Sequence, residues 1–201
     1  MVVNSKNTDR IVSTALRLMK EREYSSVTVK DICREAGVSH SSFYSVFSGK
    51  DEIILYILEG HKDDFEDTLI QLLHADSGLE KLWVLFLKCL SLAEQFGAPL
   101  TGALFQLELE GKFSLLEAVN TYVNRYHSWF LRFVEECQKS GVIRNTGEPK
   151  VLVPMGVRLS IFTTYEWCAS NGAFSLRDRA FEQIEDFYDV DPSYRGIRPM
   201  Q

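Results

Sequence analysis

The most constraining feature of the sequence is a pair of short helical segments within residues 28–47, each with its own end signals. Thr28 and Asp31 have the spacing of a capping box, in which each side chain binds the backbone N–H of the other residue. Gly37 follows where a helix commonly ends in the left-handed conformation, and Ser39 is a residue type that starts helices. Two short helices joined by a turn of two or three residues predict a helix-turn-helix.

The second of these segments, residues 39–47, combines short polar side chains with aromatic ones. Helical spacing turns one set inward: Phe43, Val46 and Phe47. It turns another set outward: His40, Ser41, Tyr44 and Ser45. A helix that enters the DNA major groove needs short polar side chains on its outer face, so that its backbone can approach the bases. Taken alone, the segment is explained equally well as a surface helix with a serine-rich start.

The charge distribution favours a nucleic-acid partner, although the whole chain of 201 residues has a net charge of −6. Residues 1–50 carry a balance of +3, so the acidic excess lies in the remainder of the chain. A basic head on an acidic body is compatible with DNA binding by the head. The four cysteines form no CxxC pair, which indicates reduced thiols and a cytoplasmic location. No apolar run is long enough for a membrane span, so we expect no membrane partner.

Residues 28–53, TVKDICREAGVSHSSFYSVFSGKDEI, resemble the DNA-binding motif of the tetracycline-repressor-like (TetR) family of bacterial transcriptional regulators. The family pattern falls on more than ten spaced positions, among them Asp31, Gly37, Tyr44 and Lys50. The resemblance covers about residues 8–55. It implies a homodimeric regulator of a palindromic operator in double-stranded DNA, most often a repressor that a small molecule releases. An activator, or a regulator without a small-molecule ligand, is the alternative.

The resemblance also implies which residues contact DNA. Thr28 and Tyr44 would bind backbone phosphates, and the backbone N–H of Thr28 is expected to remain free for this role. Base edges would be read by four residues: Ser39, His40, Ser41 and Ser42. Lys50 would bind a phosphate, because a lysine in the first turn of a helix opposes the helix dipole and an arriving anion removes that penalty. A solvated surface lysine is the alternative for Lys50.

The chain is predicted to be all-α, with a three-helix DNA-binding head and a larger helical body for ligand binding and dimerisation. We place the head at residues 1–48, the body at 49–191 and a loose C-terminal tail at 192–201. Helical periodicity predicts long helices over about 50–74, 79–96, 114–140 and 149–170. Ser175 and Asp178 are expected to cap the last helix.

The body contains many aromatic side chains, which favour a core in most proteins. In the TetR family the body encloses a ligand cavity, so the resemblance implies a mostly apolar pocket for a hydrophobic or aromatic effector. The residues predicted to line it are Phe86, Phe105, Tyr122, Tyr126, Trp129, Phe133, Arg158 and Phe162. A filled core without a cavity is the alternative.

The segment 149–170 has two apolar faces, whereas a helix with one core to cover needs only one. We therefore expect it to pair with its twin in a four-helix bundle together with the last helix. The residues predicted at this interface are Val157, Ile161, Tyr165, Cys168, Phe181, Ile184 and Tyr188. The pattern leaves open which face points outward, and a buried helix in a monomer is the alternative.

Two other classes of protein are weaker interpretations. The four histidines lack metal-ligand spacing, and no nucleophile or phosphate-loop motif is present, so we expect neither an enzyme nor a metal or other cofactor. A helical interaction protein that does not bind DNA would explain the body and leave the head unexplained. The sequence does not identify the operator, the effector or the regulated genes.

Overall fold

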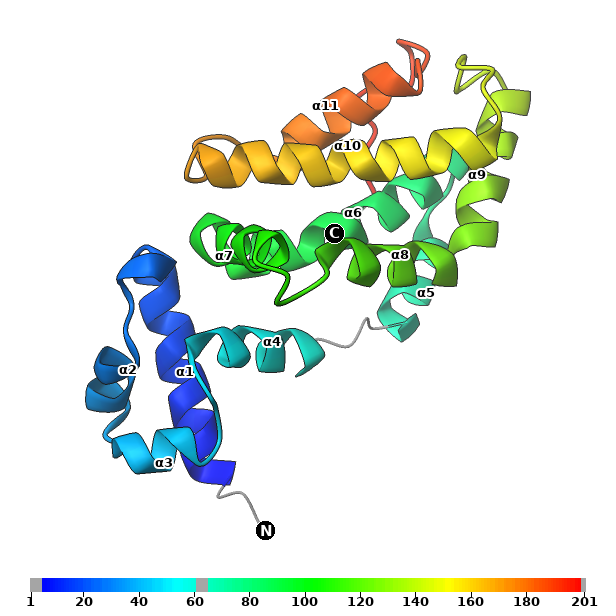
Figure 1. The fold of residues 1–201 in the computed structure, drawn as a ribbon. Coiled ribbons are helices and arrows are strands. Elements are labelled where there is room, and N and C mark those ends of the chain that lie inside the picture. Colours follow the sequence, from blue (N-terminus) through cyan, green and yellow to red (C-terminus); the bar gives the residue numbers. More distant parts are fainter. Residues whose placement is uncertain (1–4, 61–64, 200–201) are drawn as a thin grey trace. The chain divides into compact units, whose positions relative to one another are not determined.

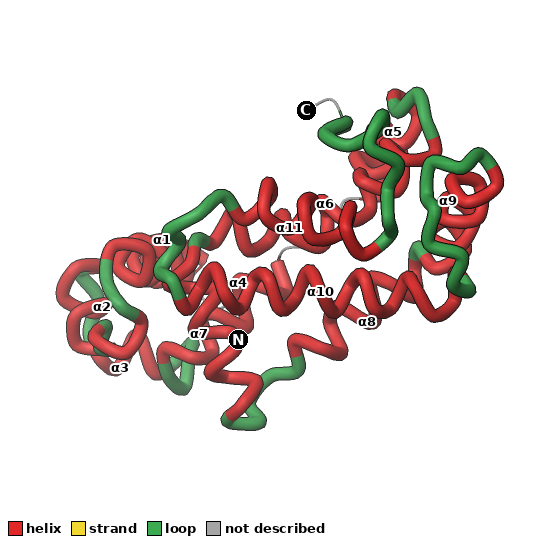
Figure 2. Tube along the Cα trace, turned by 90° about the horizontal axis from the view of Figure 1, so that it is seen from above, coloured by secondary structure: helices red, strands yellow, loops and turns green. Residues whose placement is uncertain are grey.

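The structure of the protein, a computed structural model, describes residues 5–60 and 65–199. Regular elements in this part of the chain are helices joined by loops and turns, which confirms the all-α prediction (Figures 1 and 2). Within the described residues, strand-like pairing is limited to one isolated antiparallel β-bridge, between Ile143 and Val190. No helix within the described ranges is long and apolar enough to cross a membrane.

The chain forms two compact units and crosses between them three times. The first unit comprises residues 1–62 and 96–115, and the second comprises residues 63–95 and 116–201. A segment of about twenty residues from the middle of the chain thus belongs to the same unit as the N-terminal helices.

The first unit is built around α1 (Ser5–Glu21), whose buried stripe contains Ile11, Ala15, Leu18 and Met19 as the helical spacing predicts. The other elements of this unit are η1 (Tyr24–Ser26), α2 (Val29–Ala36), α3 (His40–Tyr44), α4 (Lys50–Gly60) and α7 (Ala98–Leu109). Helix α1 packs against α2, α4 and α7, and α2 packs against α3. The helix-turn-helix therefore rests on a helix that also contacts α7.

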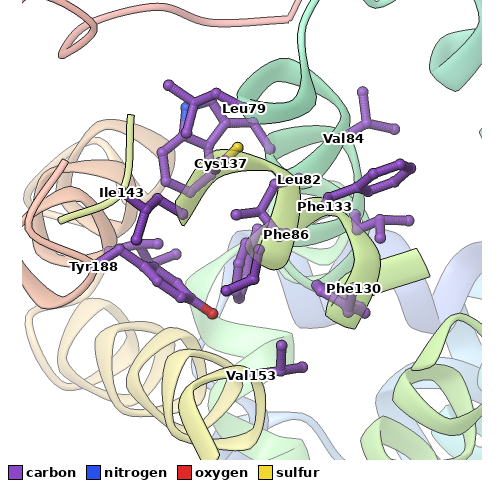
Figure 3. Close-up of a cluster of buried hydrophobic side chains, with 14 of the residues drawn as sticks. Leu79, Leu82, Val84, Phe86, Phe130, Phe133, Cys137, Ile143, Val153 and Tyr188 are labelled. Carbon is purple, nitrogen blue, oxygen red and sulfur yellow. The ribbon is translucent and has the colours of Figure 1, made fainter. Parts of the chain in front are cut away.

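The second unit contains α5 (Phe65–His74), α9 (His127–Lys139), α10 (Pro149–Ala169), α11 (Leu176–Phe187) and most of α6 (Gly78–Phe96) and α8 (Leu115–Arg125). Helices α10 and α11 lie side by side, and α10 also packs against α9 (Figure 1). Side chains of α6, α9 and α10 converge on a continuous apolar core, together with Tyr188 and Ile143 (Figure 3). The Phe86 ring lies at the centre of this core, 5.3 Å from the ring of Phe130.

The structure differs from the sequence-based helix bounds in two places. The helix expected over 50–74 is described as α4 and α5, and residues 61–64 lie outside the described residues. The helix expected over 114–140 is divided at Tyr126, whose φ of −104° and ψ of 11° leave the helical region. Hydrogen bonds from Tyr126 N–H to the Tyr122 carbonyl and from Phe130 N–H to the Tyr126 carbonyl continue across this point. The division is therefore a local change of direction that buries the Tyr126 ring.

The C-terminal residues expected to be loose are bound to α11 in the structure. The buried Glu185 carboxylate accepts hydrogen bonds from the Arg198 guanidinium at 2.6 Å and from the Gly196 N–H at 3.0 Å. Arg198 also lies over the Phe181 ring, 4.4 Å from its centroid. This part of the chain therefore completes the surface of α11, up to residue 199.

Candidate DNA-binding site

Helix α2 is fixed at both ends by local hydrogen bonds. The Thr28 hydroxyl accepts a hydrogen bond from the Asp31 N–H at 3.1 Å, and the Asp31 carboxylate accepts one from the Thr28 N–H at 3.2 Å. Gly37 ends the helix with a φ of 61°. A Cβ atom there would lie 2.9 Å from the Arg10 guanidinium, which donates a hydrogen bond to the Ala36 carbonyl. The predicted capping box and the predicted glycine end are confirmed.

Helix α3 presents a polar face and buries an aromatic one. The Ser39 hydroxyl caps the helix by accepting a hydrogen bond from the Ser42 N–H at 3.1 Å. Phe43 is fully buried, whereas His40 and Tyr44 are exposed and their ring centroids lie 6.4 Å apart. An imidazole and a phenol therefore project from a short helix whose other face is fixed in the core.

The serines of α3 form a cluster of hydroxyl groups. The Ser39 oxygen lies 2.9 Å from that of Ser41 and 2.8 Å from that of Ser42. Ser41 is exposed, whereas Ser42 is half-buried. Because a hydroxyl can both donate and accept, this cluster can exchange its internal bonds for bonds to base edges.

The geometry at Thr28 differs from the role that the resemblance implies. Its backbone N–H, expected to be free, donates to Asp31, and its hydroxyl donates to the same carboxylate at 2.6 Å. These hydrogen bonds, with the Arg34 guanidinium at 2.8 Å, hold the pKa of Asp31 below its usual range. A phosphate at Thr28 must therefore replace Asp31 as the acceptor.

Lys50 is directed into the protein and not toward solvent, which contradicts the geometry expected of a phosphate contact. Its ammonium donates to the Tyr24 carbonyl at 2.7 Å and to the Val27 carbonyl at 2.9 Å, and it lies 4.1 Å from the Tyr24 ring centroid. Partial burial lowers the pKa of Lys50. Backbone carbonyls at the start of η1 and directly after it thus bind a lysine placed unfavourably in the first turn of α4.

Residues 11–57 match the sequence profile of the bacterial regulatory proteins of the tetR family. These residues include both helices described above and the turn between them. The helix-turn-helix segment of this chain is therefore similar to that family. The chain is also 39% identical over 51 residues to the HTH-type transcriptional regulator YwcC of Bacillus subtilis. That match spans 25% of this chain and 23% of YwcC, so it concerns one segment of each protein.

Solved structures resemble the chain over almost its whole length. A protein from Saccharomonospora viridis, solved in complex with choline, has a TM-score of 0.66 at 22% identity and covers 94% of this chain and 100% of its own. FadR from Bacillus subtilis, solved in complex with stearoyl-CoA, has a TM-score of 0.57 at 21% identity and covers 89% and 96%. NalD from Pseudomonas aeruginosa, the secondary repressor of an efflux pump, has a TM-score of 0.59 at 18% identity and covers 94% and 98%. These likenesses establish the fold of the body.

The structure brings three of the predicted ligand residues together. The Tyr126 ring centroid lies 4.8 Å from that of Tyr122 and 5.7 Å from that of Trp129. Phe65, which the sequence analysis did not select, stacks on Tyr126 and Trp129 at 6.1 and 6.3 Å. The Tyr122 hydroxyl donates to the Leu85 carbonyl at 2.9 Å. These four aromatic side chains, from α5, α8 and α9 and the junction between the last two, form the aromatic cluster of the second unit.

The other predicted ligand residues lie elsewhere. Phe86 and Phe133 are buried in the core, and Phe105 is on α7 in the first unit. Arg158 and Phe162 lie on the exposed side of α10, and their assignment to a pocket stays a prediction. The buried stripe of α10 lies on the opposite side of the helix and consists of Leu152, Val153, Gly156, Val157, Ser160, Thr163 and Thr164.

Four of the predicted dimer residues are buried in the core of the single chain, and their assignment to an interface is wrong. These are Val157, Phe181, Ile184 and Tyr188, all at most 4% exposed. The physical reason is the close approach of α10 and its neighbours at Gly156, where an added Cβ would lie 3.0 Å from Phe86 and 3.1 Å from the Tyr188 hydroxyl. Of the rest, Ile161 and Cys168 are half-buried and Tyr165 is exposed.

The outward face of α10 carries an apolar row at helical spacing. Its members, Val151, Met155, Phe162 and Tyr165, are each about half exposed, between 48% and 55%. The rings of Phe162 and Tyr165 stack with centroids 6.2 Å apart, and Arg158 interrupts the row. We call these four residues the outer row of α10.

Proposed function

We propose that the protein is a transcriptional regulator that binds a palindromic operator as a homodimer, and that a small hydrophobic or aromatic molecule releases it from DNA. The capped helix-turn-helix carries this proposal. Its short recognition helix exposes His40, Ser41 and Tyr44 on one face, and the buried Phe43 anchors the other face in the core. Side chains of this kind suit base edges and phosphates in a major groove. The proposal assigns the chain no catalytic activity.

The contacts with DNA divide into two kinds. His40 and Ser41, with Ser42 through exchange of its hydroxyl bond, would read bases and so determine the preferred sequence. Tyr44 would bind a phosphate through its exposed hydroxyl and contribute affinity for all sequences. Lys50 supports the head from inside, since its donors are directed to backbone carbonyls.

The second copy would be held by the outer row of α10. A stable dimer buries roughly 800 Å² on each partner, and two half-exposed aromatic rings with two aliphatic neighbours are typical centres of such an interface. A two-fold pair of heads would then lie about 34 Å apart on the operator, one turn of DNA. The four free cysteines suit the reducing cytoplasm, where a bacterial regulator meets its DNA.

The aromatic cluster supports an effector with apolar or aromatic groups. The phenols of Tyr122 and Tyr126 and the indole of Trp129 place polar atoms among mostly apolar surroundings. Small-molecule sites have this composition. FadR and the Saccharomonospora protein were solved with stearoyl-CoA and choline, so related folds accept ligands of different chemistry. An activator, or a regulator without an effector, remains the alternative proposal.

The test is a gel-shift selection from random duplexes at low salt with the full chain. We expect an enriched inverted repeat whose binding weakens steeply with salt, since bound phosphates release counterions. Replacing His40 with Ala should change the enriched sequence, whereas Tyr44→Phe should weaken binding to all sequences by about 1 kcal/mol. Tyr56→Phe is the matched control, because Tyr56 is a half-exposed tyrosine of α4 outside the proposed contact face.

The same complex tests release by a small molecule. Hydrophobic and aromatic compounds that raise the unfolding temperature and quench tryptophan fluorescence should also weaken the selected complex. If a duplex sequence is enriched but no compound weakens the complex, the protein is a regulator without such an effector. No enriched sequence at low salt would favour a helical interaction protein instead.

A further inference from the structure

The Asp51 carboxylate joins three segments of the first unit that are distant in sequence. The Lys112 ammonium lies 2.7 Å from Asp51 and 2.8 Å from Glu110, and the Tyr24 hydroxyl donates to the same Asp51 carboxylate. Burial opposes ionisation of Asp51, but the hydrogen bonds from Lys112 and Tyr24 hold its pKa below the usual range. We call Tyr24, Asp51 and Lys112 the clasp.

The turn that carries Lys112 has a fixed backbone. Gly111 adopts a φ of 68°, and the Lys112 N–H donates to the Leu107 carbonyl at 2.9 Å, which closes the end of α7. The Glu108 carboxylate accepts a hydrogen bond from the Leu115 N–H at the start of α8. Lys112 therefore moves with the ends of α7 and α8.

On its other side, the clasp holds the segment that leads into the helix-turn-helix. Tyr24 is buried, and its ring and carbonyl are both bound by Lys50, the residue before Asp51. The chain runs from Tyr24 through η1 to Thr28, which caps α2. A shift of Lys112 relative to Asp51 therefore reaches the start of α2 through Tyr24.

The connectivity gives this contact a role beyond stability. Of the three crossings between the two units, two lie at the ends of the segment 96–115 that contains α7 and Lys112. A change in α6 or α8 thus enters the DNA-binding unit through α7 (labelled in Figure 1). An effector acts only by its different affinity for two states, so some contact must link its site to the head.

We propose that the clasp is the contact through which the second unit sets the position of the helix-turn-helix. This inference rests on the proposed DNA binding and adds the residues that connect the two functions. Lys112 touches no DNA in this assignment. It is a positioning residue, and without it the protein should still bind DNA, but α8 should no longer respond to the bound DNA.

The experiment is hydrogen–deuterium exchange of the full chain, with and without a duplex from the selection above. In the wild-type protein, DNA should slow exchange in α3 and also in residues 116–125 of α8, there by at least about threefold. In the Lys112→Met variant, DNA should still slow exchange in α3 and should no longer slow it in α8. Lys112→Arg, which keeps the ion pair, should restore the protection of α8, and Lys139→Met serves as a control because Lys139 is an exposed lysine of α9.

Asp51→Asn provides a second variant that weakens the same contact from the other side, and thermal unfolding checks that each variant is folded. Protection of α8 that persists in both folded variants would overturn the inference. A wild-type protein in which DNA does not slow hydrogen exchange in α8 would overturn it as well. Failure of the proposed function is a separate observation, because the wild-type chain would then select no duplex at all.

Discussion

The ammonium of Lys50 binds the carbonyls of Tyr24, the first residue of η1, and of Val27, which follows η1, at 2.7 and 2.9 Å. Lys50→Met keeps the apolar stem of the side chain and removes these charge-assisted hydrogen bonds. We expect the free energy of unfolding to fall by about 1–2 kcal/mol, measured by urea denaturation. Lys30→Met, at an exposed position of α2, should stay within about 0.5 kcal/mol of the wild-type protein. Equal stability of the two variants, with DNA affinity lost only in Lys50→Met, would restore the phosphate role to Lys50.

The same residues show which details of the site a sequence can predict. Thr28, Gly37 and Ser39 were predictable because each acts within its own helix end, where side-chain type and spacing decide the hydrogen bonds. The partners of Lys50 lie 23 and 26 residues away, so no local pattern indicates them. The contact between Lys112 and Asp51, 61 residues apart, is hidden from the sequence for the same reason.

Among the elements, α11 depends on the C-terminal segment that covers it. Glu185 is 4% exposed, and Arg198 supplies the ion pair that accompanies its burial. Arg198→Met leaves this carboxylate with the Gly196 N–H, and we expect a loss of about 2 kcal/mol in the free energy of unfolding. The control is Arg132→Met, whose exposed pair with Glu136 should contribute less than about 1 kcal/mol. Similar small losses in both variants would mean that the segment is bound too weakly to matter.

The existence of the helices was easier to predict than their ends. Apolar periodicity indicated α1, α10 and α11, because each has a stripe to bury. The turn at Tyr126 carries neither glycine nor proline, so only the packing of its buried ring in the second unit reveals it. The two prolines and low apolar content of the C-terminal residues suggested a loose tail, whereas two arginines bind it to α11.

For the whole molecule, the decisive question was which face of α10 turns outward. The sequence showed two apolar faces of similar character, and pattern alone does not distinguish them. Gly156 decides which face is buried in the structure. Because Gly156 has no Cβ, the face of α10 that carries it can approach Phe86 and Tyr188 to contact distance. The close approach of α10 to the core is thus decided by a tertiary contact, and the outer row is what remains exposed.

The proposed dimer can be tested at this outer row. Phe162 is 55% exposed and stacks on Tyr165, so Phe162→Glu places two like charges near the centre of a two-fold interface. Light scattering at micromolar concentration should give about twice 23.0 kDa for the wild-type chain and 23.0 kDa for the variant. Leu73→Glu is the matched control, since Leu73 is an 82% exposed leucine of α5 and its loss should leave the dimer intact. The monomeric variant should also lose binding to an inverted repeat far more than to a single half-site, because only the dimer joins two heads. A wild-type particle of 23.0 kDa would contradict the proposed dimer. A dimer that survives Phe162→Glu and dissociates with Leu73→Glu would place the contact elsewhere.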